Sequence, residues 1–218
     1  HPDGQPVLRD FNLTIQPGDR VAITGPAGSG KSSLLDILFG LRIPTGGHVT
    51  MSGVELRELR PDALRRRVAL VRETEVFMGS VAENVRLGRS SISTDDVRKS
   101  LADVGLLEDV LRLPQRLDTQ LVGSGHPLTS TQLLRLMLAR GCAGKPSLLL
   151  IDGTLDLLPD GEALALVQWL CRPEQPWNLV LVTGREALAA ACDRRIELRR
   201  QSSSSDTKQR TATEDANE

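Results

Sequence analysis

The sequence has very few aromatic residues and no tyrosine at all. Aromatics make up 2% of the 218 residues. Proteins that bind single-stranded nucleic acid stack the bases on aromatic side chains, and proteins that neutralise nucleic-acid phosphates carry an excess of Lys and Arg. The formal net charge of this chain is −1. Both features argue against a nucleic acid as the partner.

Cysteine is scarce and long apolar runs are missing. Cys142, Cys171 and Cys192 are widely spaced and form no metal-ligand pattern, which is typical of reduced thiols in a cytosolic protein. Apolar segments such as SLLLI and LVLV have strand length, far below the roughly 20 residues that span a bilayer. No signal peptide is visible. Because the chain opens at His1 in mid-phrase, we expect it to be part of a longer protein.

Segments rich in β-formers alternate along the chain with segments that are apolar at helical spacing. Residues 93–96 (STDD) give a clear signal for a helix start. The first half predicts strands at 7–15 and 20–24 around a Pro17–Gly18 turn, a helix at 31–41, a hairpin at 46–56 and a helix leading into a strand at 60–73. The second half predicts helices between 81 and 140, buried strands at 146–152 and 177–184, and a helix at 161–171 between those strands.

A cluster of arginines lies in and after the predicted helix near residue 65. It consists of Arg65, Arg66, Arg67 and Arg72. Such a cluster could attract an anionic partner, but runs of like charge are more often the solvated face of a helix. We therefore expect these side chains to face solvent and keep an anionic partner as the alternative.

A glycine-rich segment, GPAGSGKS, begins where the strand at 20–24 ends. It fits the pattern G-x-x-x-x-G-K-[ST] between a strand and a helix, the context of a phosphate-binding P-loop. The glycines let backbone N–H groups wrap the β-phosphate, and the helix N-terminus adds partial positive charge. We expect Lys31 to reach the terminal phosphates and the Ser32 hydroxyl to bind Mg²⁺. The predicted phosphate-binding residues are Gly25, Pro26, Ala27, Gly28, Ser29, Gly30, Lys31, Ser32 and Ser33.

The segment LLLID places Asp152 at the end of a buried strand. A carboxylate at the carboxyl edge of the sheet, opposite the P-loop, is where a second contact to Mg²⁺ belongs. An apolar run followed by Asp is common and weak alone, but it gains weight beside a P-loop. Ser32 and Asp152 are therefore the predicted metal ligands, and ATP and Mg²⁺ the predicted cofactors.

The order of elements predicts an α/β fold. We expect a P-loop NTPase (RecA-like) core with a mostly parallel sheet, an antiparallel β edge and an inserted helical subdomain. The tail after residue 198 is polar and low in complexity, so we expect it to be disordered. The predicted domains are 1–72 with 141–198 for the ATP-binding core, 73–140 for the helical subdomain and 199–218 for the tail.

Residues 1 to about 198 resemble the nucleotide-binding domain of an ABC transporter of the exporter kind. Residues 6–35 resemble the family's opening with Walker A, and residues 68–88 resemble its Q-loop followed by the exporter phrase. The run LTSTQLLRLMLARGCAGKPSLLLID (128–152) resembles the signature, its helix and Walker B, and NLVLVTGRE (178–186) resembles the strand before the switch histidine. The resemblance implies that the signature faces a partner's nucleotide in trans. Its residues here are Leu128, Thr129, Ser130, Thr131 and Gln132.

The chain departs from the family's motifs where hydrolysis is concerned. The Q-loop glutamine falls on Glu73, the signature Ser-Gly-Gly on Thr129, Ser130 and Thr131, the base glutamate on Gly153, the D-loop aspartate on Pro159 with Asp160 one place late, and the switch histidine on Gly184. The aromatic that stacks on adenine would precede His1. Hydrolysis needs a base close to a positioned water, and losing one such group lowers the rate by roughly 10²–10⁴-fold. We therefore expect Glu73 to lie at the nucleotide and no catalytic residue to be present.

These observations lead to a hypothesis of an ABC exporter domain that binds ATP and hydrolyses it weakly or not at all. The resemblance implies a second nucleotide-binding domain in a homo- or heterodimer, and a transmembrane domain in the same full-length chain. It also implies a place on the cytoplasmic face of the plasma or inner membrane, with residues 71–79 facing the coupling helices, in a protein that powers or regulates transport.

Three alternatives stay open. One is an active ATPase whose catalysis uses displaced residues such as Glu73 or Asp160. Another is a soluble regulatory ABC module with no transporter attached. A P-loop nucleoside or nucleotide kinase is more distant, because it would not need the phrase LTSTQ before Walker B.

Overall fold

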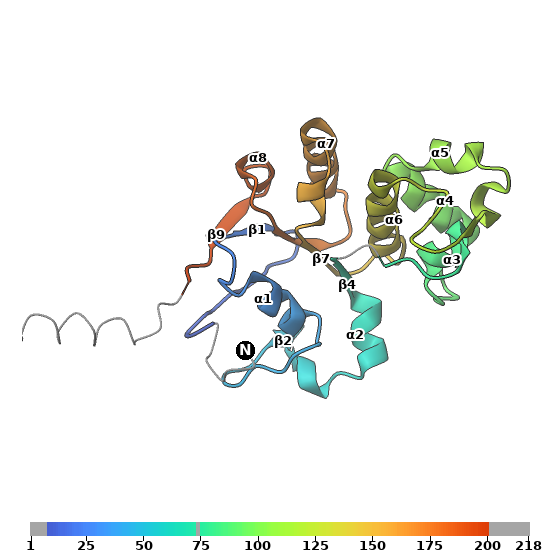
Figure 1. Ribbon diagram of the computed structural model, residues 1–218. Helices are drawn as coiled ribbons and strands as arrows, with labels where there is room; N and C mark the ends of the chain where they lie inside the picture. The colour runs from blue at the N-terminus through green and yellow to red at the C-terminus, as the bar shows by residue number, and fades with distance from the viewer. Residues whose placement is uncertain (1–7, 73–74, 201–218) are drawn as a thin grey trace, which may run out of the picture.

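The computed structural model describes residues 8–72 and 75–200, which build a five-stranded sheet with helices on both faces (Figure 1). All pairings in this sheet are parallel, and the strand order is β4-β7-β8-β1-β9. Its strands are β1 Arg20–Thr24, β4 Val68–Val71, β7 Leu148–Asp152, β8 Asn178–Val182 and β9 Arg194–Glu197. Two antiparallel pairs stand apart, β2 Thr50–Met51 with β3 Val54–Glu55, and β5 Gly79–Ser80 with β6 Gln120–Leu121. The predicted α/β fold is confirmed, and its antiparallel edge strands form small sheets of their own.

The helices divide into three groups around the sheet (Figure 1). Helices α1 and α2 lie on one side, α7 and α8 on the other, and α3 to α6 gather beyond β4. The helices are α1 Lys31–Leu38, α2 Pro61–Arg67, α3 Val81–Arg86, α4 Thr94–Asp103, α5 Leu107–Arg112, α6 Ser130–Ala143, α7 Asp160–Leu170 and α8 Glu186–Ala189. Short 3₁₀ turns are η1 Leu56–Glu58, η2 Arg116–Asp118 and η3 Thr154–Leu157. Nowhere in residues 8–72 and 75–200 is a helix both long and apolar enough to cross a bilayer.

The central strands are buried on both faces, as strands of a parallel sheet are. In β7, Leu148 and Leu150 pack with α1 in one hydrophobic cluster, whereas Leu149 and Ile151 pack in a second cluster with the helices of the other face. This alternation follows from the two-residue period of a strand. It explains why the sequence of β7 is a continuous apolar run.

Several helices begin where the sequence supplies a capping residue. The Ser93 hydroxyl accepts a hydrogen bond from the Asp96 N–H, and the Asp96 carboxylate accepts one from the Ser93 N–H, which together form a capping box at the start of α4. Ser80 with Glu83 caps α3 in the same way. The predicted helix start at residues 93–96 is therefore confirmed.

Two local expectations are wrong. The described part of the strand predicted at 7–15, residues 8–15, forms no strand; instead Leu8, Phe11, Leu13 and Ile15 pack on the α1 side of the core. Their apolar alternation anchors the segment without a hydrogen-bonded ladder. The arginine cluster is the second: Arg65, Arg66 and Arg67 are exposed as expected, but Arg72 follows β4 and binds two carboxylates. The domain bounds stay a prediction, and the predicted tail from residue 201 lies outside the described residues.

The buried side chain of Asn84 links helices α3 and α6 to residues 77–80, the segment between β4 and α3. Asn84 is fully buried, and its side chain accepts a hydrogen bond from Phe77 N at 3.2 Å and donates to Phe77 O at 3.1 Å and Ser80 O at 3.0 Å. Arg140 of α6 donates to the Asn84 backbone oxygen at 2.7 Å and to its side-chain oxygen at 3.1 Å. These bonds fix the approach to β5 against α3 and α6.

We expect Asn84→Ala to lower the free energy of unfolding by about 2–4 kcal/mol, because it leaves several buried polar groups without partners. Urea unfolding followed by circular dichroism measures the change. The exposed Asn12→Ala is the matched control and should change stability by less than about 0.5 kcal/mol. Equal effects of the two variants would contradict the role given to Asn84.

Candidate nucleotide-binding site

The glycine-rich loop leaves the end of β1 and enters α1 in a backbone conformation that requires glycine. Gly25, Gly28 and Gly30 have φ of +138°, +77° and +95°. L-residues with side chains rarely adopt this region. At Gly25 an added Cβ would also lie 2.2 Å from the Leu198 carbonyl oxygen. The loop conformation therefore requires glycine at these three positions, where no side chain covers the backbone.

The start of α1 offers donors to an anion. Its N-cap, Gly30, provides no side-chain capping bond, and the first turn holds no acidic residue. Three or four N–H groups at such an end lack intrahelical acceptors, and the helix dipole adds positive charge. Within the loop, the Ser29 hydroxyl is buried and has no hydrogen-bond partner among the described residues. A bare backbone, an uncapped helix end and an orphaned hydroxyl fit a phosphate group.

Lys31 lies folded across the same loop. Its ammonium donates to the carbonyl oxygens of Gly25 at 2.8 Å and Pro26 at 2.7 Å. These two contacts hold a positive charge at the loop, and within residues 8–72 and 75–200 no carboxylate pairs with it. A bound phosphate would offer charged oxygens in place of these neutral carbonyl acceptors. Because hydrogen bonds to charged acceptors are stronger, the ammonium can turn to the phosphate.

Asp152 ends β7 beside α1, and a guanidinium bridges the two elements. Arg72 Nε donates to Asp152 Oδ2 at 2.7 Å, and another Arg72 nitrogen donates to Asp36 Oδ1 at 2.7 Å. A third donates to the Ser32 backbone oxygen at 3.2 Å. Asp36 also accepts from Arg42 at 2.7 Å. The predicted metal ligands Ser32 and Asp152 are therefore joined through Arg72.

The charges in this network reinforce one another. Burial alone would raise the pKa of the Asp36 carboxyl, but hydrogen bonds from Arg42 and Arg72 outweigh burial and hold that pKa below its ordinary value. Burial would lower the pKa of Arg72, yet its bonds to Asp36 and Asp152 raise it instead. Both groups stay ionised at neutral pH.

The positions after β7 and β8 present backbone rather than catalytic side chains. Gly153 has φ +70°, and an added Cβ would meet nothing within 4 Å. The Gly184 N–H donates to Asp156 Oδ2 at 2.7 Å. The Thr183 hydroxyl, one residue earlier, donates to the other oxygen of Asp156. Neither glycine brings a carboxylate or an imidazole to the edge of the sheet.

Comparison with known proteins bears on this arrangement. The sequence profile described as "ABC transporter" matches residues 8–155, which is more than half of the chain. The chain belongs to the ABC transporter family.

Relatives of this ABC chain are much longer proteins. It is 32% identical over 151 residues to ATP-binding cassette sub-family B member 6 of Xenopus tropicalis, covering 69% of this chain and 18% of that protein. It is 32% identical over 190 residues to the mycobactin import ATP-binding/permease protein IrtB of Mycolicibacterium thermoresistibile, covering 86% and 33%. The chain therefore spans at most a third of either relative.

A solved structure supports the fold of the ABC chain. A bacterial Atm1-family ABC exporter with ATP bound superposes with a TM-score of 0.79, covering 94% of this chain and 37% of that chain. The two sequences are 24% identical, so the likeness bears on the fold alone.

The residues predicted to form the ABC signature, 128–132, lie at the start of α6. Thr129 caps the helix: its hydroxyl accepts from Gln132 N at 3.3 Å, and the Gln132 side chain accepts from Thr129 N at 2.9 Å. Thr129 and Ser130 are exposed, Thr131 is half-buried and Leu128 is buried. The helix end that the resemblance directs at a partner's nucleotide is therefore open to solvent, with side chains where the family has glycine.

The remaining sequence-predicted positions divide into two groups. Glu73 lies outside the described residues. Pro159 and Asp160 begin α7, and the Asp160 carboxylate is almost fully exposed and binds Arg185. The Asp160 carboxylate therefore forms an ion pair with Arg185 and does not lie at Gly153 or Gly184.

Sequence reasoning missed two side chains that shape the site. Asp156 holds the loop after β8, and Thr154 is buried and donates to the Arg72 backbone oxygen at 2.9 Å. The available signal was that both residues closely follow Asp152, the predicted metal ligand, in the sequence. Their partners are 27 to 83 residues distant in the sequence, and local patterns do not reveal such pairs.

We expect Asp156→Ala to lower the free energy of unfolding by about 1–3 kcal/mol, because the Gly184 N–H and the Thr183 hydroxyl lose their acceptor. Chemical denaturation measures the loss. Asp160→Ala, four residues away, removes an exposed ion pair and should change stability by less than about 1 kcal/mol. A larger effect at Asp160 would show that we have assigned the anchoring carboxylate wrongly.

Proposed function

We propose that this chain is the nucleotide-binding domain of an ABC exporter, and that it binds ATP but hydrolyses it slowly or not at all. The observation that carries the proposal is the contrast within one edge of the sheet. The P-loop at Gly25–Lys31 is sterically fitted for phosphate, while Gly153 and Gly184 offer no group to activate water. Binding and cleavage use separable residues, so one can persist without the other.

Magnesium is part of this proposal. A hydroxyl and a carboxylate are oxygen donors of the kind that Mg²⁺ prefers, and Ser32 and Asp152 supply them. When bound, the ion would neutralise phosphate charge. Arg72 occupies one oxygen of the same Asp152 carboxylate, so the two cations compete for it.

The domain acts by holding partners together. ATP that binds only where two nucleotide-binding domains close on each other shifts the equilibrium toward closure, without any hydrolysis. The exposed N-terminus of α6 at Thr129 and Ser130 supports a place for the signature in such a closed pair. A second domain, identical or different, is the proposed partner.

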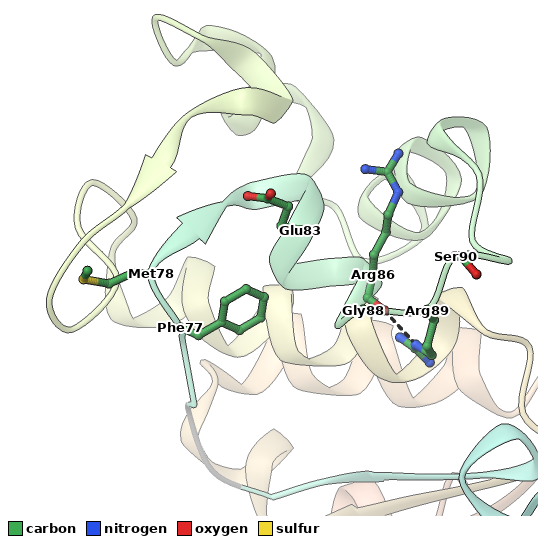
Figure 2. Close-up of a pocket in the computed structure, with 7 residues that line it drawn as sticks. All are labelled: Phe77, Met78, Glu83, Arg86, Gly88, Arg89 and Ser90. Atoms are coloured by element: carbon green, nitrogen blue, oxygen red, sulfur yellow. Dashed lines mark hydrogen bonds between the residues drawn. The ribbon is translucent and has the colours of Figure 1, made fainter. Parts of the chain in front are cut away.

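A transmembrane domain in the full-length chain is the other proposed partner, and it would place this domain on the cytoplasmic face of a membrane. The segment before β5 supports a docking place. Phe77 is 39% and Met78 81% exposed, and both line a cavity of about 420 Å³ (Figure 2). Figure 2 shows Arg86, Arg89 and Ser90 on the other side of this cavity. Exposed apolar side chains beside a concave surface are typical of interaction sites.

We expect Lys31→Ala to weaken ATP binding by about 10- to 100-fold, because it removes a charged hydrogen-bond donor to phosphate. Isothermal titration calorimetry measures the affinity, with the exposed Lys99→Ala as the control that should bind as the unaltered chain does. Phosphate release should stay below roughly 1 s⁻¹, the low end of enzyme turnover. Faster release that Lys31→Ala abolishes would favour an active ATPase with displaced catalytic residues.

ATP should drive self-association if the partner is a second copy of this chain. Analytical ultracentrifugation is expected to show a dimer with ATP and a monomer with ADP, stable over hours because ATP is not consumed. Ser130→Trp fills the approach to the start of α6 and should prevent the dimer, whereas Ser91→Trp on another exposed turn should not. A monomer at saturating ATP would exclude self-pairing and leave a different domain as the partner.

A further inference from the structure

Arg72 makes three contacts that converge on the predicted metal position. It reaches Asp152 at the end of β7, Asp36 in α1 and the Ser32 backbone oxygen, at 2.7, 2.7 and 3.2 Å. The Asp152 side chain is 8% exposed, and the Arg72 side chain is 27% exposed. One guanidinium therefore touches both residues predicted to hold magnesium, through a carboxylate on one and a backbone oxygen on the other.

The network is not explained by a need to neutralise Asp36. Arg42 already binds Asp36 Oδ2 at 2.7 Å, so Asp36 has a cation of its own. For Asp152, Arg72 is the cationic partner among the described residues. Among the residues that the structure describes, two carboxylates thus face two guanidiniums, and Lys31 adds a further positive charge at the P-loop.

This charge balance lowers the attraction of the Asp152 carboxylate for a divalent ion. A metal-binding carboxylate attracts the ion because its charge is otherwise uncompensated. Here the charge of Asp152 is compensated by a group that stays protonated at any physiological pH. An ion approaching Asp152 must break a charge-assisted hydrogen bond or sit close to a fixed cation.

We infer that Arg72 is a resident counter-cation of the nucleotide site, so that the chain takes up a metal-free nucleoside triphosphate nearly as well as its magnesium complex. The inference rests on the proposed ATP binding and deepens it. Lys31, the uncapped start of α1 and the Arg72 guanidinium supply the positive charge that the triphosphate requires.

The test compares the dissociation constant of ATP in excess Mg²⁺ with that in excess EDTA, for the unaltered chain and three variants. For the unaltered chain, we expect removal of magnesium to weaken binding by about threefold or less, because fixed cations already balance Asp152. This measurement needs no variant, so it decides the first half of the inference even if a substitution harms folding.

Arg72→Gln frees the Asp152 carboxylate and should raise the magnesium effect to about tenfold or more, the size of one charge-assisted hydrogen bond. Arg72→Lys keeps the charge and should stay close to the unaltered chain. Arg42→Gln is the matched control, because it removes the same charge from the other side of Asp36 without touching Asp152. It should leave the magnesium effect unchanged.

Each outcome decides between the inference and the proposed function. A tenfold or greater loss on removing magnesium from the unaltered chain overturns the role of Arg72 while leaving ATP binding in place. So does an equal magnesium effect in Arg72→Gln and Arg42→Gln. Absence of ATP binding under both conditions overturns the proposed function and this inference with it.

Discussion

Parallel pairing of four neighbouring strands is the constraint on which the candidate site depends. In the order β4-β7-β8-β1, every carboxyl end lies on one edge of the sheet. That edge therefore collects Arg72 after β4, Asp152 at the end of β7, Thr183 after β8 and the P-loop after β1. Ligands of open α/β sheets bind at this edge for the same reason. Residues as far apart in sequence as Asp36 and Asp152 come to share one guanidinium because of it.

Features that depend on neighbouring residues could be predicted from the sequence, whereas features that depend on residues distant in the chain could not. The bounds of β1 and the helix start at residues 93–96 depend on neighbours within a few residues, and the sequence pattern predicted both. The apolar alternation of residues 8–16 was equally local but misleading, because packing on the core satisfied it without a ladder. Arg72 and Asp156 act through partners distant in the chain, so their roles became visible only with the fold.

The two halves of the candidate site differ in how their residues are fixed. In the proposed site, phosphate would be bound by backbone N–H groups that positive φ at Gly25, Gly28 and Gly30 orients, and a side-chain change elsewhere leaves that backbone geometry in place. Activation of water requires side chains at single positions. A chain can therefore lose cleavage by a few substitutions while the backbone part of the phosphate site, the loop between β1 and α1, persists.

Gly153 and Gly184, where the sequence predicted that catalytic side chains are missing, are both held by hydrogen bonds of their backbone N–H groups. Gly153 sits at φ +70°, where a glutamate would be strained by about 1–3 kcal/mol. Its N–H donates to Val182 O at 3.1 Å, and the Gly184 N–H is held by Asp156. An added Cβ would have open space at Gly153 and would meet only the Asp156 carboxylate at Gly184, at 3.7 Å, so the backbone strain at position 153 is the main obstacle to a glutamate there. With Arg72 on Asp152 and Asp156 on the loop after β8, the residues around Gly153 and Gly184 form an anchoring network. This network supports the proposal that the domain holds nucleotide rather than hydrolysing it.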